Sequence, residues 1–164
     1  MAIFDFLKKN KEPSVDLLAI LEDAEATARR AELYCILPAL AETFLLLDNP
    51  SLRLAERQVM QIRSCIVDIK EHSAPECVPF DIYITERIRE IVEQKGSHVR
   101  EANAEYDIRK CDAELAMSRA QLEVALREGD DVKVSKLEYA IATAERERAG
   151  YLEEYRRMKG DNHG

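Results

Sequence analysis

The chain has 164 residues, enough for one domain with a substantial core, and it is 46% apolar and 34% charged, which excludes both a disordered and a membrane-embedded chain. Only five glycines and five prolines leave few places for turns, so the composition favours a few long helices and an all-α fold. The net charge of −8 disfavours a general nucleic-acid binder, because neutralising phosphates requires a basic face.

Residues 1–13 combine apolar bulk with a cluster of lysines. This pattern suits a short amphipathic helix lying at an anionic membrane surface. The alternative is that Phe4 and Phe6 pack against the helical body, or that the segment is a frayed end. The candidate membrane-binding residues are Ile3, Phe4, Phe6, Leu7, Lys8, Lys9 and Lys11.

Residues 14–72 predict a base of two apolar helices. The first helix begins at Ser14 and is expected to kink or restart at Pro38, because proline removes an amide and clashes with the preceding turn. A turn at 48–51 precedes the second helix, whose apolar residues recur in steps of three and four. They are Leu52, Ala55, Val59, Ile62, Ile66 and Ile69.

Residues 73–81 contain two prolines and are interpreted as an ordered linker. A third helix is expected from Ile82. At Gly96 the sequence predicts a kink rather than a full stop, because the apolar spacing resumes at Val99.

Residues 82–159 predict two long helices that fold back on each other at Gly129. Glycine supplies the left-handed residue that ends a helix, and Asp130 accepts hydrogen bonds from the first amides of the next. Residues 160–164 are interpreted as a disordered tail. The second of the two long helices carries apolar or small residues in alternating steps of three and four, the spacing of a coiled-coil seam, and only Arg148 interrupts them. These seam residues are Val134, Leu137, Ile141, Ala144, Tyr151, Tyr155 and Met158. The expected fold is therefore all-α, with four main helices: two apolar N-terminal helices packed at the base of a long C-terminal antiparallel coiled-coil hairpin.

The sequence contains few of the motifs that are typical of catalytic or metal sites. Asp68 and His72 lie one turn apart, but no Glu-x-x-His spacing, glycine-rich phosphate loop or nucleophile motif occurs. The sequence therefore predicts no catalytic residue, no cofactor and no metal ligand. The four cysteines, without a C-x-x-C pair, are interpreted as reduced thiols of a cytoplasmic protein; they are Cys35, Cys65, Cys77 and Cys111.

The predicted function is a non-enzymatic helical adaptor or assembly subunit that contacts another protein or a second copy of itself. A membrane version adds peripheral contact through residues 1–11 at the inner face of a membrane. Arg148 is expected to splay the hairpin or to pair with an acid such as Asp112. The candidate partner-binding residues are Ile84, Ile88, Ile91, Arg148, Tyr151, Tyr155 and Met158.

The alternative function is a small metal- or nucleotide-dependent helical enzyme. It would use the acidic residues of the first helix, which are otherwise interpreted as a solvated face. These residues are Glu22, Asp23, Glu25 and Glu32.

Overall fold

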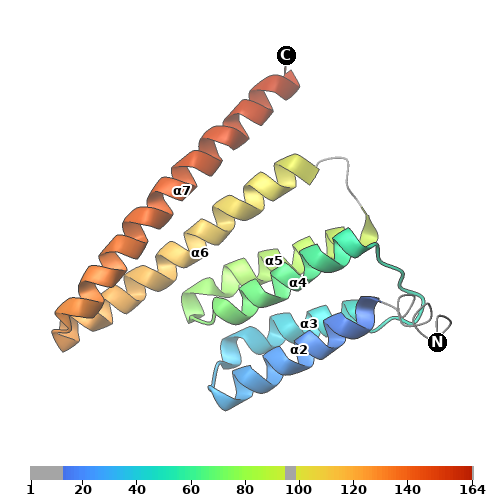
Figure 1. Ribbon diagram of the computed structural model, residues 1–164, viewed down its shortest axis with the longest axis horizontal. Coiled ribbons are helices and arrows are strands. Elements are labelled where there is room, and N and C mark those ends of the chain that lie inside the picture. The colour runs from blue at the N-terminus through green and yellow to red at the C-terminus, as the bar shows by residue number, and fades with distance from the viewer. Residues whose placement is uncertain (1–12, 95–98, 164) are drawn as a thin grey trace, which may run out of the picture. The chain divides into compact units, whose positions relative to one another are not determined.

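A computed structural model describes residues 13–94 and 99–163, and within these ranges the chain contains helices and no strand (Figure 1). The all-α prediction is confirmed. The predicted membrane-binding residues lie outside the described ranges. None of the helices that the structure describes has the length and apolar character needed to cross a membrane.

The described residues form six α-helices and two 3-10 turns. The helices are α2 (Pro13–Arg30), α3 (Leu37–Leu47), α4 (Glu56–Glu71), α5 (Val78–Glu93), α6 (Val99–Glu128) and α7 (Asp131–His163), and the turns are η1 (Tyr34–Ile36) and η2 (Pro75–Cys77). The chain divides into two compact units. The first comprises Met1–Ser73 and Asp81–Lys95, and the second comprises Ala74–Phe80 and Gly96–Gly164.

In the first unit, helices α2 to α5 run back and forth as antiparallel neighbours (Figure 1). Helix α2 packs on α3 and α4, and its buried Ala24 and Ala28 allow a close approach. Gln58 of α4 donates a hydrogen bond from Nε2 to the Ile91 carbonyl oxygen of α5 at 2.8 Å. The largest fully buried apolar side chains are Leu17, Ile36, Leu47, Ile62, Ile66, Ile69, Ile84 and Ile88.

The first helix ends earlier than predicted. Glu32 adopts a left-handed conformation with φ of 58°. Its amide donates to the Arg29 carbonyl at 3.3 Å, and the Leu33 amide donates to the Ala28 carbonyl at 2.8 Å. These two bonds form a Schellman motif, which satisfies the last carbonyls of α2 without a glycine. Pro38 then lies in the first turn of α3, so the predicted restart is present but the break precedes it.

Helix α4 begins at Glu56, four residues after the predicted start at Leu52. Ala55 is extended, with φ of −69° and ψ of 153°, and its amide donates to Oε1 of Gln58 at 2.7 Å. Gln58 therefore fixes the start of α4 with one end of its amide group and holds α5 with the other.

The linker and the third helix have other bounds in the structure than the sequence predicts. Helix α5 already begins at Val78 and ends at Glu93, where Gln94 is left-handed with φ of 55°. The prediction of one helix with a kink at Gly96 is thus wrong, because α5 ends at Glu93 and α6 begins at Val99. Residues 95–98 lie outside the described ranges.

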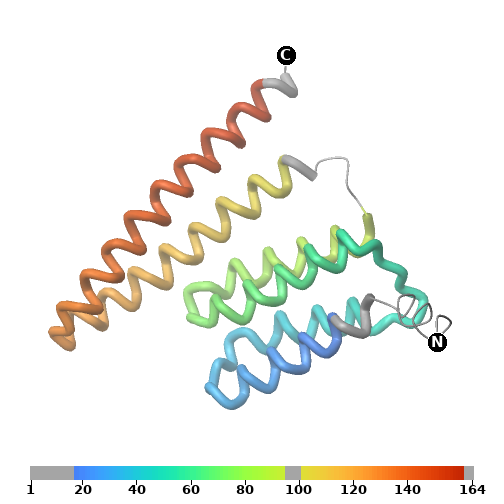
Figure 2. Tube along the Cα trace, in the orientation of Figure 1, coloured from blue at the N-terminus to red at the C-terminus, as the bar shows by residue number. Residues whose placement is uncertain are grey.

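The second unit is a hairpin of α6 and α7, which run in opposite directions from the bend at Gly129 (Figure 2). All predicted seam residues of α7 are buried or half-buried. Helix α7 continues through His163, where a disordered tail was predicted. The placement of the N-terminal helices at the base of this hairpin stays a prediction.

Residues 74–80, which include η2 and the first turn of α5, belong to the hairpin unit. Buried Cys77 of η2 donates its thiol hydrogen to the Ala113 carbonyl oxygen of α6 at 3.6 Å. The ring of Phe80 lies 5.9 Å from that of Tyr106, at an interplanar angle of 40°. Tilted aromatic pairs at this separation are favourable. Residues 74–80 therefore pack on α6 rather than serving only as a connection.

The bend is a complete Schellman motif followed directly by a helix cap. Gly129 has φ of 70°, its amide donates to Leu126, and the Asp130 amide donates to Ala125 at 3.1 Å. Oδ1 of Asp130 then accepts from the Lys133 amide at 3.2 Å. One residue pair thus ends α6 and begins α7, as the sequence predicts.

Substitutions of two glycines by alanine should have opposite effects on the free energy of unfolding. Gly129→Ala forces a side chain into the left-handed region and should cost about 1 kcal/mol. Gly150 lies inside α7 in open space, so Gly150→Ala should stabilise by about 0.5–1 kcal/mol through helix propensity. Urea unfolding measures both, and equal effects at the two positions would contradict this account of the bend.

Candidate functional site

A regular series of polar side-chain pairs joins α6 to α7. Asp112 accepts from Nε of Arg148 at 2.6 Å, Glu105 accepts from the Tyr155 hydroxyl at 2.9 Å, and Glu101 lies 3.4 Å from Nζ of Lys159. In each pair the two residues lie equally far in sequence on either side of Asp130. The pairs therefore record one antiparallel register along the length of both helices.

Arg148 is a seam residue whose predicted partner is present. Its guanidinium and the Asp112 carboxylate are each partly exposed, at 37% and 45% of the side chain, so the pair contributes at most about 1 kcal/mol. The structure supports a role in setting the register rather than in splaying the hairpin, because the pair is closed and continues the same series. Arg119 and Glu145 form a similar exposed pair at 3.1 Å nearer the bend.

A thiol and two carboxylates converge beside this pair. Cys111 and Glu114 lie on one face of α6, and Glu147 faces them from α7; their ligand atoms all lie within 4.8 Å of one another. Cys111 is 3% exposed, Glu114 is half-buried and Glu147 is exposed. Among the described residues, these three side chains lie close enough together to hold a metal ion.

The surroundings of Cys111 are strongly negative. Burial, the largest cause, and four neighbouring carboxylates together raise the pKa of its thiol to about 11; the carboxylates belong to Glu114, Glu147, Asp107 and Asp112. Burial and the charges of Asp107, Cys111 and Glu147 also raise the pKa of the Tyr151 hydroxyl. The thiol is therefore a poor nucleophile at neutral pH, which disfavours covalent catalysis at this position.

The predicted partner-binding residues fall into both units. Ile84, Ile88 and Ile91 are buried in the first unit, at 0%, 0% and 7% exposure. The predicted residues of α7 belong to the second unit, where each is half-buried along the seam; they are Arg148, Tyr151, Tyr155 and Met158. The three isoleucines are therefore core side chains.

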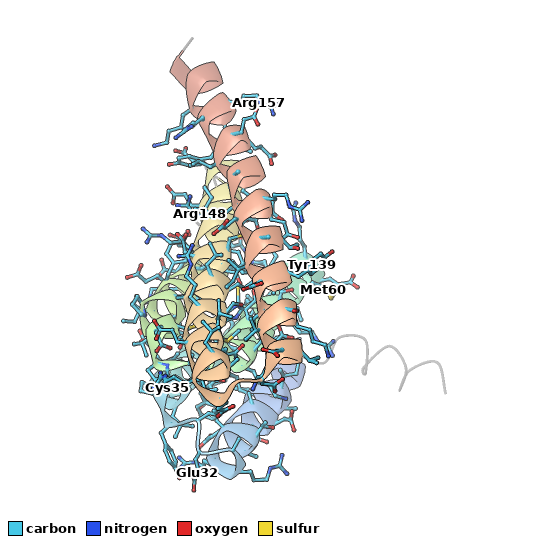
Figure 3. All side chains as sticks on the ribbon, turned by 90° about the vertical axis from the view of Figure 1, so that its left-hand side faces the viewer. Glu32, Cys35, Met60, Tyr139, Arg148 and Arg157 are labelled. Atoms are coloured by element: carbon cyan, nitrogen blue, oxygen red, sulfur yellow. The ribbon has the colours of Figure 1, made fainter. Side chains whose placement is uncertain are left out.

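Exposed apolar side chains that were not predicted from the sequence lie near the bend. Val124 and Leu126 of α6 are 42% and 59% exposed, and Val132 and Tyr139 of α7 are 67% and 70% exposed. Val132 and Tyr139 are seven positions apart and therefore lie on one face of α7. Tyr139 projects from the side of α7 opposite Arg148 (Figure 3). The indication of this surface in the sequence is that these apolar residues occupy positions outside the seam.

The acidic residues of the first helix do not converge. Glu22, Asp23, Glu25 and Glu32 are all exposed. Asp23 pairs with Lys70 of α4 at 3.2 Å, and Glu25 pairs with Arg29 at 3.1 Å. Asp68 and His72, in contrast, are both buried, and the His72 ring contacts the Asp68 carbonyl oxygen through Nδ1 at 2.7 Å. This contact lies at the C-terminal end of α4, where His72 is the C-cap residue.

No protein-family model, curated protein or solved structure matches this chain. The arrangement of its own residues is therefore the basis for any functional conclusion.

Asp81, in the first turn of α5, should make the stability of the protein depend on pH. It is 2% exposed, neither carboxylate oxygen has a hydrogen-bond partner among the described residues, and burial raises its pKa from 3.8 to about 7. The folded chain keeps this proton between about pH 4 and 7, whereas the unfolded chain loses it. Stability should therefore fall by roughly 2–4 kcal/mol as the pH rises through this window.

Urea unfolding of Asp81→Asn between pH 4 and 8 tests this expectation. The variant should lose this part of the pH dependence, because an amide does not titrate. The same exchange at exposed Asp48 serves as the matched control and should leave the dependence in place. An Asp81→Asn protein whose stability follows the wild-type pH curve would show that another group is responsible.

Proposed function

We propose that this protein is a non-enzymatic helical adaptor or assembly subunit that contacts another protein through the bend end of its hairpin. The observation that carries the proposal is the set of four large apolar side chains left exposed there, Val124, Leu126, Val132 and Tyr139. Single exposed apolar residues are common on soluble proteins, whereas a contiguous apolar patch marks an interaction surface; Val132 and Tyr139, which share one face of α7, are the candidates for such a patch.

The construction of the hairpin supports this use. The ladder of pairs from Asp112–Arg148 to Glu101–Lys159 and the seam hold α6 and α7 in one register, so the bend is presented at the end of two mutually supporting helices. A rigid element loses little conformational entropy when a partner binds it. Tyrosine is also among the residues that contribute most at interfaces, because its ring buries a large area with few rotatable bonds.

The raised thiol pKa of Cys111 supports a non-enzymatic role over nucleophilic catalysis. The acidic first helix gives no support to the enzyme alternative, since its carboxylates are exposed and two of them are paired with basic side chains. Membrane contact through residues 1–11 is a separate proposal that rests on their sequence. Sedimentation of the full chain and of a chain lacking residues 1–12 with anionic liposomes distinguishes it from an adaptor that acts in solution.

Affinity capture with matched variants tests the adaptor proposal. Leu126→Glu combined with Tyr139→Glu removes apolar surface and adds two charges. Gln121→Glu combined with Ser135→Glu adds the same two charges at exposed polar positions of the same helices. Proteins captured by the wild type should be retained by the control and depleted about tenfold or more with the Leu126/Tyr139 variant, because a hot-spot residue contributes about 2 kcal/mol or more.

Circular dichroism should show the same helix content for both double variants, since all four substituted positions are exposed. Equal capture by the two variants would mean that the bend is not the contact surface. A wild-type chain that captures no protein above the level of the Leu126/Tyr139 variant would contradict the proposal as well.

A further inference from the structure

The convergence of Cys111, Glu114 and Glu147 has no role in the proposed adaptor function. Cysteine sulfur and carboxylate oxygen are both ligands of zinc, with bond lengths of about 2.3 Å and 2.0–2.2 Å. Two such atoms on one ion are therefore less than about 4.5 Å apart. The three ligand atoms already lie within 4.8 Å of one another, so small side-chain rotations would bring them onto a single ion.

Cys111 differs from Cys35 and Cys77 in what its sulfur contacts. Cys35 donates to the Ser73 carbonyl and Cys77 to the Ala113 carbonyl, so these two thiols have backbone partners. The Cys111 thiol is buried, at 3% exposure, yet it has no hydrogen bond to any described residue, and its sulfur lies within 4.8 Å of a carboxylate oxygen of Glu114 and of Glu147. A buried polar group normally has a partner, and this one has two carboxylate oxygens within 4.8 Å.

The nearby cations of α6 and α7 do not neutralise Glu147. Arg148 pairs with Asp112 and Arg119 pairs with Glu145. Glu147 makes no hydrogen bond or ion pair with a described residue, and the carboxylates of Asp107 and Asp112 add to the negative field around the sulfur. A divalent cation would relieve this repulsion.

We propose that Cys111, Glu114 and Glu147 form a binding site for a divalent cation of borderline softness, with zinc as the best match. The sulfur selects against calcium and magnesium, which take oxygen ligands, and three protein ligands leave a fourth position for water or another donor. Binding converts the thiol to a thiolate: the S–H bond breaks, a sulfur–metal bond forms, and the proton leaves to the solvent.

The site would join α6 to α7 at a fixed position in their register. Cys111 and Glu114 come from one helix and Glu147 from the other, so metal binding requires the hairpin to be closed. The exposed side chain of Glu147 gives the ion a route of access to the buried sulfur. This inference is independent of the partner surface at the bend, and either can fail without the other.

Titration of the full-length, reduced protein with Cd²⁺ tests the proposal, because a cadmium–thiolate bond gives a charge-transfer absorption in the ultraviolet that cadmium–carboxylate contacts lack. The wild type should bind one equivalent with this absorption. Cys111→Ser should lose the absorption, and Glu147→Gln, an exposed substitution that should not disturb folding, should weaken binding about 10-fold or more. Zn²⁺ should displace the Cd²⁺.

Two matched controls separate this site from other ligands. Cys35→Ser removes a half-buried thiol elsewhere and should keep the absorption, and Glu145→Gln removes the same charge from α7 two residues away and should keep the affinity. A wild-type chain without the absorption would overturn the proposal. So would an absorption that survives Cys111→Ser, or a Glu147→Gln variant that binds as tightly as Glu145→Gln.

Discussion

The left-handed turn at Gly129 is the constraint on which the hairpin depends. Its φ of 70° lets the amides of Gly129 and Asp130 satisfy the last carbonyls of α6, and the Asp130 side chain then caps α7. Reversal within two residues sets which residue of α7 faces which residue of α6. The pairs Asp112–Arg148, Glu105–Tyr155 and Glu101–Lys159 follow from that register.

The same register creates both functional candidates. It brings Glu147 of α7 next to Cys111 and Glu114 of α6, which no single helix could do. By directing Leu137 and Ala144 into the seam, it also leaves Val132 and Tyr139 on a face of α7 that α6 does not cover. The hairpin thus combines a buried thiol in a negative environment with exposed apolar side chains near its bend, and the two depend on the same pairing of helices.

Sequence patterns predicted the features that rest on residue-specific backbone chemistry. Gly129, Asp130 and the spacing of the seam residues specified the bend and the inner face of α7, and the break in the seam at Arg148 pointed to Asp112. The ends of α2 and α5 could not be predicted, because the left-handed residues there are Glu32 and Gln94 rather than glycine. The Cys111 group was not predicted, because its ligands come from two helices. Counting equal numbers of residues to either side of Gly129 places Arg148 roughly opposite Cys111, and the same count places Glu147 near Cys111.

Zero-length carbodiimide cross-linking tests the antiparallel register most directly, at the end of the hairpin farthest from the bend. Glu101 and Lys159 lie 3.4 Å apart although 58 positions separate them in sequence. We expect an amide bond between these two residues within one chain, identified by mass spectrometry on a mixture of normal and ¹⁵N-labelled protein. Links from Lys159 to carboxylates of α7 alone, or a Glu101–Lys159 link that joins labelled to unlabelled chains as often as random pairing of chains requires, would contradict it.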